Sequence, residues 1–281
     1  MKKLILVIIS VIVLLTQTTA CTIRYKTTEG DSESSESSEY DIPVIDPYTP
    51  HTVDDYIIKI IDSSSDSIEI IRYIGEETDI TIPKELGELP VISIGNKAFA
   101  DLENIQHITV PNGIEKIGDS AFSNCRGLLS VELPDSVTNI GQRAFADCVK
   151  LKSFNIPEKI SVIEEYTFSN CYVLEEITLP DGITSIEKGA FINCVKLNGV
   201  TLPNNLKTLE VDAFYNCFGL TSLSLPDSLE YLGKRTFDGC FNLEEIFFKG
   251  SVYTVFVIDS RYNDANLLSA VNGEPEEDND K

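Results

Sequence analysis

Hydrophobic residues recur through the middle of the chain with a period of 23 residues, and the polar positions between them keep the same period. Each period carries an Ala-Phe or Thr-Phe pair, and the seven pairs are Ala98-Phe99, Ala121-Phe122, Ala144-Phe145, Thr167-Phe168, Ala190-Phe191, Ala213-Phe214 and Thr236-Phe237. A fixed period of this length indicates one supersecondary unit stacked on copies of itself. The pattern therefore predicts a repeat solenoid, in which function belongs to a broad surface and not to one deep pocket.

Within each period, a short alternation of apolar and polar residues precedes a proline. The segment from Leu174 to Pro180 follows the motif Leu-x-x-Ile-x-Leu-Pro, which is typical of a short strand with one buried face. The proline has no N–H to donate and ends the strand. Stacked strands predict a parallel β-sheet on one face, and the segment leading to the Ala-Phe pair is predicted to be a single turn of helix or an irregular arc.

This pattern resembles the BspA-like leucine-rich repeat family, bacterial cell-surface proteins with a 23-residue repeat. The resemblance covers about residues 80–250 and rests on the strand motif, on the Ile-Gly pairs before Ala-Phe, and on the cysteine after it. Glu164, Glu187 and Glu210 stand where the turn usually has glycine, which places the local turn geometry in question. The resemblance implies a leucine-rich repeat solenoid with the sheet on one face and short helical or irregular arcs opposite.

The start of the chain carries targeting features. Residues 1–20 are predicted to be a signal peptide, because Lys2 and Lys3 precede an apolar run of twelve residues that is too short to span a bilayer. Cys21 is predicted to be a lipidation site that tethers the protein to a membrane surface without inserting it. The alternative is ordinary secretion, which leaves Cys21 a free thiol.

The remaining segments flank the repeats. Residues 21–50 form an acidic Ser/Glu-rich stalk, predicted to be disordered because it has too little apolar content to fold. Residues 51–81 contain two β-rich runs, predicted to form an N-terminal hairpin that caps the solenoid. About seven coils of 23 residues are predicted over residues 82–250. Residues 251–272 are predicted to be a C-terminal cap, and residues 273–281 an acidic disordered tail.

The charge balance narrows the choice of partners. The chain has 22 Lys and Arg against 45 Asp and Glu, which gives a formal net charge of −23 at pH 7. Nucleic acids and anionic lipids require clustered basic residues. We therefore expect no nucleic-acid partner, and contact with a membrane only through the lipid anchor.

Six cysteines follow the repeated phenylalanines at a spacing of three residues, and they are Cys125, Cys148, Cys171, Cys194, Cys217 and Cys240. The favoured interpretation is a buried structural ladder, in which each cysteine acts as a small hydrophobic residue. Disulfides between neighbouring coils are an alternative in an exported protein, although equivalent side chains that point the same way are poorly placed to pair. A metal site is the weakest alternative, because His51 and His107 lie far from most of these cysteines and no C-x-x-C occurs.

The sequence contains no G-x-S-x-G, phosphate loop or H-E-x-x-H motif, which are common signatures of catalytic sites. With only two histidines, a Ser–His or Cys–His pair has little support. We therefore predict no enzyme, no catalytic residues and no cofactor.

The outward-facing positions of the predicted strands form the candidate binding face. Its residues are Ser130, Glu132, Ser153, Asn155, Glu176, Thr178, Thr201, Ser222 and Ser224. Small polar side chains suit a shallow contact with a protein or a glycan, but any solvent-facing strand has similar residues.

A further column of turn residues after the prolines is rich in acids, and its members are Asn112, Asp135, Glu158, Asp181, Asn204 and Asp227. Stacked carboxylates repel one another, and calcium would relieve the repulsion through oxygen ligands. Solvated turn acids account for the same pattern, so no metal site is predicted.

These observations predict a non-catalytic protein of the cell surface that binds a macromolecule, whether a host or matrix protein, a glycan or an envelope protein. Adhesion to host surfaces, matrix proteins or other cells is what the family resemblance implies, because a fold does not determine a function. The alternative is a structural spacer or a recognition subunit of a cell-envelope complex.

Overall fold

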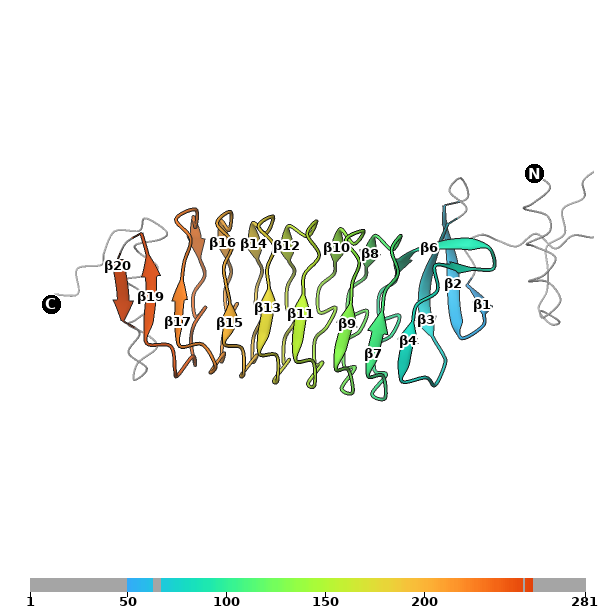
Figure 1. Ribbon diagram of the computed structural model, residues 1–281, viewed down its shortest axis with the longest axis horizontal. Helices are drawn as coiled ribbons and strands as arrows, with labels where there is room; N and C mark the ends of the chain where they lie inside the picture. Colours follow the sequence, from blue (N-terminus) through green and yellow to red (C-terminus); the bar gives the residue numbers. More distant parts are fainter. Residues whose placement is uncertain (1–49, 63–66, 250, 255–281) are drawn as a thin grey trace, which may run out of the picture.

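The computed structural model describes residues 50–62, 67–249 and 251–254. These residues form a nearly straight solenoid of stacked coils, as Figure 1 shows, so the predicted repeat fold is confirmed. The signal peptide, Cys21, the acidic tail and most of the predicted stalk and C-terminal cap lie outside the described residues. Within them, no helix is long and apolar enough to cross a bilayer.

One short strand from each coil joins a parallel ladder, here called the front ladder. Its strands are β4 (Asp79–Thr81), β7 (His107–Thr109), β9 (Ser130–Glu132), β11 (Ser153–Asn155), β13 (Glu176–Thr178), β15 (Gly199–Val200), β17 (Ser222–Ser224) and β19 (Glu245–Phe248). Paired residues are one repeat apart, so that Phe154 lies opposite Ile177. The central residue of a strand such as β11 is buried and its two neighbours are exposed, as the sequence alternation predicts. Pairing is interrupted between β9 and β11 and again between β15 and β17.

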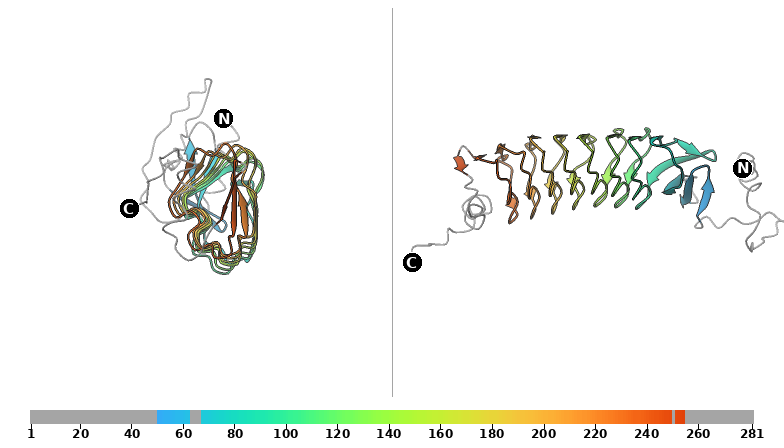
Figure 2. Two further views of the ribbon diagram at one scale, coloured as in Figure 1. Left: turned by 90° about the vertical axis from the view of Figure 1, so that its left-hand side faces the viewer. Right: turned by 90° about the horizontal axis from the view of Figure 1, so that it is seen from below.

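A second parallel ladder, which the sequence did not predict, runs along the opposite side of the coils; it is called the rear ladder (Figure 2). Its strands are β6 (Leu89–Ile94), β8 (Lys116–Ile117), β10 (Asn139–Ile140), β12 (Val162–Ile163), β14 (Ser185–Ile186), β16 (Thr208–Leu209) and β18 (Tyr231–Leu232). Apart from β6, each strand has two residues, which is too short to show the alternation by which strands are recognised. Most neighbouring coils are therefore hydrogen-bonded through strands on two sides and not on one, although pairing in the rear ladder is interrupted between β10 and β12.

The arcs that carry the Ala-Phe pairs consist of turns, and no helix occurs in the described residues. Of the two forms that the sequence left open, the irregular arc is the one observed. The physical reason is a residue in each arc with positive φ, such as Asn124 and Asn193 at 60° and 62°, because a right-handed helix cannot continue through that conformation. Backbone bonds still connect neighbouring arcs, as from the Phe122 N–H to the Ala144 carbonyl at 2.8 Å.

The core is a continuous aromatic column along the solenoid axis. The repeated phenylalanines from Phe99 to Phe237 stack with ring centroids 5.1–6.2 Å apart. Tyr73 continues the column, since its ring lies 5.4 Å from that of Phe99. Because one coil cannot enclose these rings alone, stacking of coils is what buries them.

Antiparallel strands stand at both ends of the described chain. Near the N-terminus, β2 (Tyr56–Asp62) pairs with β1 (His51–Val53) and with β3 (Ser67–Tyr73), and β3 joins β6 in parallel. The short β5 (Glu85–Leu86) pairs with β6. At the other end, β20 (Ser251–Thr254) pairs with β19. It stays a prediction that residues 51–81 stabilise this end of the solenoid as a cap.

Candidate binding surfaces

The front ladder carries the residues of the predicted binding face on one side of the solenoid. Ser130 is half-buried and the other eight are exposed. The ring nitrogen Nδ1 of His107 lies 2.8 Å from Ser130 Oγ, so this end of the face is held by side-chain contact. Thr201 follows β15 instead of lying within it. The backbone thus places all nine residues along one surface, which is long and shallow.

A groove of about 660 Å³ opens in this face where pairing stops between β15 and β17. Thr201, Ser222 and Ser224 from the predicted face line it, together with apolar residues that include Leu202 and Pro226. The other six predicted residues lie outside the groove. The interruption that creates it could not be inferred from the repeat, because each coil has nearly the same pattern.

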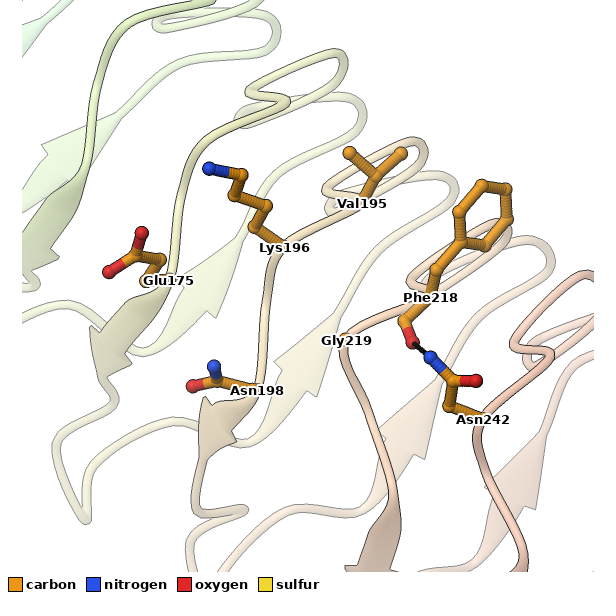
Figure 3. A pocket seen from close by; sticks show the side chains of 7 residues that line it. All are labelled: Glu175, Val195, Lys196, Asn198, Phe218, Gly219 and Asn242. Atoms are coloured by element: carbon orange, nitrogen blue, oxygen red, sulfur yellow. Dashed lines mark hydrogen bonds between the residues drawn. The ribbon is translucent and has the colours of Figure 1, made fainter.

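A second hollow lies where the arcs turn into the front ladder, and we call it the corner hollow (Figure 3). It has a volume of about 280 Å³ and is lined by Glu175, Val195, Lys196, Asn198, Phe218, Gly219 and Asn242. The Asn242 side-chain amide donates a hydrogen bond to the Phe218 carbonyl at 2.7 Å. A Cβ on Gly219 would lie 2.6 Å from the Leu197 carbonyl oxygen, so the floor of the hollow requires glycine. No residue here was predicted, because residue types at these positions differ between coils.

The six cysteine thiols are free and buried. Each donates a hydrogen bond to a phenylalanine carbonyl of the preceding coil, as from Cys171 Sγ to the Phe145 oxygen at 3.2 Å. Burial raises the pKa of Cys125 to about 12, and it raises the pKa of Cys148 well above its ordinary value. Protonated, buried thiols are poor nucleophiles and poor metal ligands. The structure therefore shows a ladder of free thiols and not the alternative disulfide pairing.

A second ladder of polar side chains was missed from the sequence. The asparagine before each of three successive cysteines bonds to its counterpart one coil away: Asn193 Nδ2 donates to Asn170 Oδ1 at 2.7 Å, and Asn216 Nδ2 donates to Asn193 Oδ1 at 2.8 Å. These residues have positive φ, a conformation that asparagine tolerates better than most residues. The recurring Asn or Asp before cysteine was the signal that would have predicted this ladder.

Carboxylates stack in the turns where glutamate replaces the usual glycine. Burial raises the pKa of Glu164, and the neighbouring charges of Glu187 and Asp119 raise it further. Asp212 instead forms an ion pair with Arg235, since its Oδ2 lies 2.7 Å from Arg235 Nη2. In the described residues no group of three His, Cys, Asp or Glu side chains is arranged to hold a metal ion, so the calcium alternative gains no support.

The family model for the BspA type leucine rich repeat region matches the chain in six copies, over residues 92–191 and 161–257. No curated protein matches significantly.

Solved structures with similar folds include a protein of T. pallidum and one of Faecalibacterium prausnitzii. A leucine-rich repeat protein of T. pallidum is 30% identical, with a TM-score of 0.63, and the match covers 69% of this chain and 91% of that one. A leucine-rich cell-surface protein of Faecalibacterium prausnitzii is 23% identical with a TM-score of 0.53, and the match covers 71% of this chain and 70% of that one.

Proposed function

The chain belongs to the BspA-type leucine-rich repeat family, and from this premise we propose that it is a non-catalytic cell-surface protein that binds a macromolecular partner through its front ladder. The observation that carries the proposal is the groove between β15 and β17, which opens at one of the two interruptions of the front ladder and is lined by three residues of the predicted binding face. Partners of stacked-repeat proteins bind along such extended surfaces, because no coil encloses a deep site.

The chemistry of the face favours a protein partner. Serine, threonine and asparagine provide hydrogen-bonding groups that need little desolvation, and the buried Leu202 and Leu225 lie beneath them in the lining of the groove. Glu132 and Glu176 give the face negative charge, which would complement a basic patch on the partner and speed association. A host-surface, matrix or envelope protein fits this description, and a glycan at the same face is an alternative outcome of the test.

Export completes the proposal. The predicted signal peptide and lipidation at Cys21 would place the solenoid at the bacterial surface, with residues 21–50 as a spacer from the membrane. Growth with a radiolabelled fatty acid tests the anchor: the wild-type protein should become labelled and Cys21→Ala should not. Equal labelling of both would exclude Cys21 as the anchor.

The binding proposal is tested with the full chain against immobilised matrix proteins, host cells and extracts of the producing cell's envelope. The variant Glu132→Lys/Glu176→Lys alters the front ladder, and Glu115→Lys/Glu230→Lys makes the same charge change at exposed positions beside the rear ladder. We expect saturable binding that the first variant weakens and the second retains. Saturable binding that neither variant changes would show that the binding site lies outside the front ladder. No binding to any partner would favour the alternative role of envelope spacer.

A further inference from the structure

A partly exposed apolar stripe runs along the corner of the solenoid, one residue after each cysteine, in which Tyr172 and Phe241 are exposed and the other members are half-buried. From the second cysteine onwards its members are Val149, Tyr172, Val195, Phe218 and Phe241. Tyr172 is 43% exposed and Phe241 is 57% exposed, although residues of this size are normally buried. The rings of Phe218 and Phe241 lie 5.2 Å apart and are tilted by 38°. This corner stripe is distinct from the front ladder, and Val195 and Phe218 also line the corner hollow.

The corner hollow supplies hydrogen-bonding groups beside the stripe. Lys196 and Asn198 extend from one coil toward Glu175 of the preceding coil (Figure 3). Within the described residues neither Lys196 nor Asn198 has a side-chain hydrogen bond or ion pair, so their donor and acceptor groups are available to a ligand. Asn242 is different, because its amide is fixed on the Phe218 carbonyl and its side-chain oxygen remains as an acceptor.

The charges around the hollow are few, which restricts the ligand. Lys196 contributes one positive charge and Glu175 one negative charge, and Lys152 Nζ lies 3.3 Å from the Glu175 carboxylate, so these three groups together carry a single excess positive charge. A chain with a net charge of −23 thus has a local site without excess negative charge. A ligand with several negative charges would find only Lys196 as an unpaired cation here, whereas an uncharged ligand with many hydroxyl groups could use donors and acceptors together.

We propose that the corner hollow and the corner stripe bind a neutral carbohydrate. A sugar ring has an apolar face of polarised C–H groups, which is attracted to the negative face of an aromatic ring. Phe218 and Phe241 provide this platform, while Asn198, Lys196 and Glu175 bind the hydroxyls at the ring edge. A protein partner would favour an apolar core depleted in lysine and glutamate, whereas Lys196 and Glu175 border the apolar stripe here.

The repetition of the stripe points to a chain of sugars. Stacked coils advance by about 4.8 Å, a step comparable with the length of one sugar unit in an extended polysaccharide. Tyr172 lies two coils before Phe218 in the same column, so a linear glycan that occupies the hollow would pass over it. The site goes beyond the proposed binding by the front ladder, and either site can fail in experiment without the other.

The test uses the full chain and isothermal titration with hexasaccharides of β1,4-linked glucose, β1,4-linked N-acetylglucosamine and β1,4-linked mannose, and with a sulfated heparin hexasaccharide as the charged probe. We expect at least one neutral probe to bind. Phe241→Ala and Asn198→Ala should each weaken that binding by roughly tenfold, because one removes a stacking ring and the other an edge partner. Leu129→Ala, which truncates an exposed apolar residue away from the hollow, and the front-ladder variant Glu132→Lys/Glu176→Lys should bind as the wild type does.

Two readouts separate binding from folding. Thermal unfolding of Phe241→Ala should match that of the wild type, since its ring is exposed, and Tyr172→Ala provides a second truncation of the stripe. In NMR spectra, ring protons of the bound sugar should shift upfield, as stacking on an aromatic face requires. Absence of binding by all three neutral probes, preference for the sulfated probe, or equal binding by the wild type, Phe241→Ala and Asn198→Ala would each overturn the proposal.

Discussion

The aromatic column makes a sharp prediction at Phe191, which is fully buried in the middle of the solenoid. Its ring lies 5.5 Å from that of Phe168 and 5.1 Å from that of Phe214, and it is nearly parallel to both. Phe191→Ala removes the ring but leaves the backbone bond from its N–H to the Ala213 carbonyl. The perturbation is therefore a cavity at the interface between coils, with the backbone ladder retained.

The expected loss of stability is large. Truncation of a buried phenylalanine costs about 3–5 kcal/mol, and each stacked pair that is lost adds about 0.5–1.5 kcal/mol beyond area burial. Phe191 loses two such pairs, so we expect a cost of about 5 kcal/mol. Phe237 stacks on Phe214 alone at the longer distance of 6.2 Å, and Phe237→Ala should therefore cost about 1 kcal/mol less.

Urea unfolding followed by far-UV circular dichroism and tyrosine fluorescence measures both effects. Because a coil contacts only its neighbours, a central cavity should also weaken the coupling between the two halves and produce a two-step transition. Tyr172→Ala is the control, since its exposed side chain should change the unfolding free energy by less than about 1 kcal/mol. A cost for Phe191→Ala as small as that of Tyr172→Ala would refute the aromatic column as the main source of stability.

Three further predictions follow from the polar ladders and the thiols. Burial raises the pKa of Cys125 from 9.0 to about 12, so the thiol ionises at a lower pH in the unfolded chain than in the folded one. The stability that the protonated thiol provides is therefore complete below pH 9 and is lost as the pH rises toward 12. A urea midpoint that does not fall between about pH 8 and about pH 10 would contradict this. Asn193→Ala removes the side-chain hydrogen bonds to Asn170 and Asn216 and places alanine at a φ of 62°. It should therefore lower the free energy of unfolding in urea by about 2–4 kcal/mol. A loss below about 0.5 kcal/mol would argue against a stabilising role of the asparagine ladder. Glu187→Gln removes a negative charge beside Glu164 and should lower the Glu164 pKa, as measured by NMR titration; an unchanged pKa would show that the charge of Glu187 does not contribute to the shift.

The sequence predicted the fold well because the period is exact over seven copies. The strand before each proline, the phenylalanine column and the register of the cysteines were all predicted from recurring residue types, whereas the asparagine ladder recurs in the same way and was missed. The rear ladder was missed because strands such as Asn139–Ile140 have only two residues. Its pairing depends on the stacking of coils, which local patterns do not encode.

The candidate sites were less predictable for a related reason. Repetition identifies which positions face outward, and Glu132 and Glu176 do lie on the exposed front ladder. The groove depends on the loss of pairing between β15 and β17, and the corner hollow depends on departures from the repeat at Gly219 and Phe218. Neither feature recurs in every coil, so only the three-dimensional arrangement brings these residues together.

The most direct test of the central claim is the affinity of one identified protein partner for three versions of the full chain: wild type, Ser222→Arg in the groove, and Thr184→Arg beside the rear ladder. Both substitutions place a large cation at an exposed polar position, and only Ser222 lines the groove. Binding through the front ladder predicts that Ser222→Arg weakens the affinity at least about tenfold while Thr184→Arg leaves it unchanged. Equal affinity of all three versions would contradict the account.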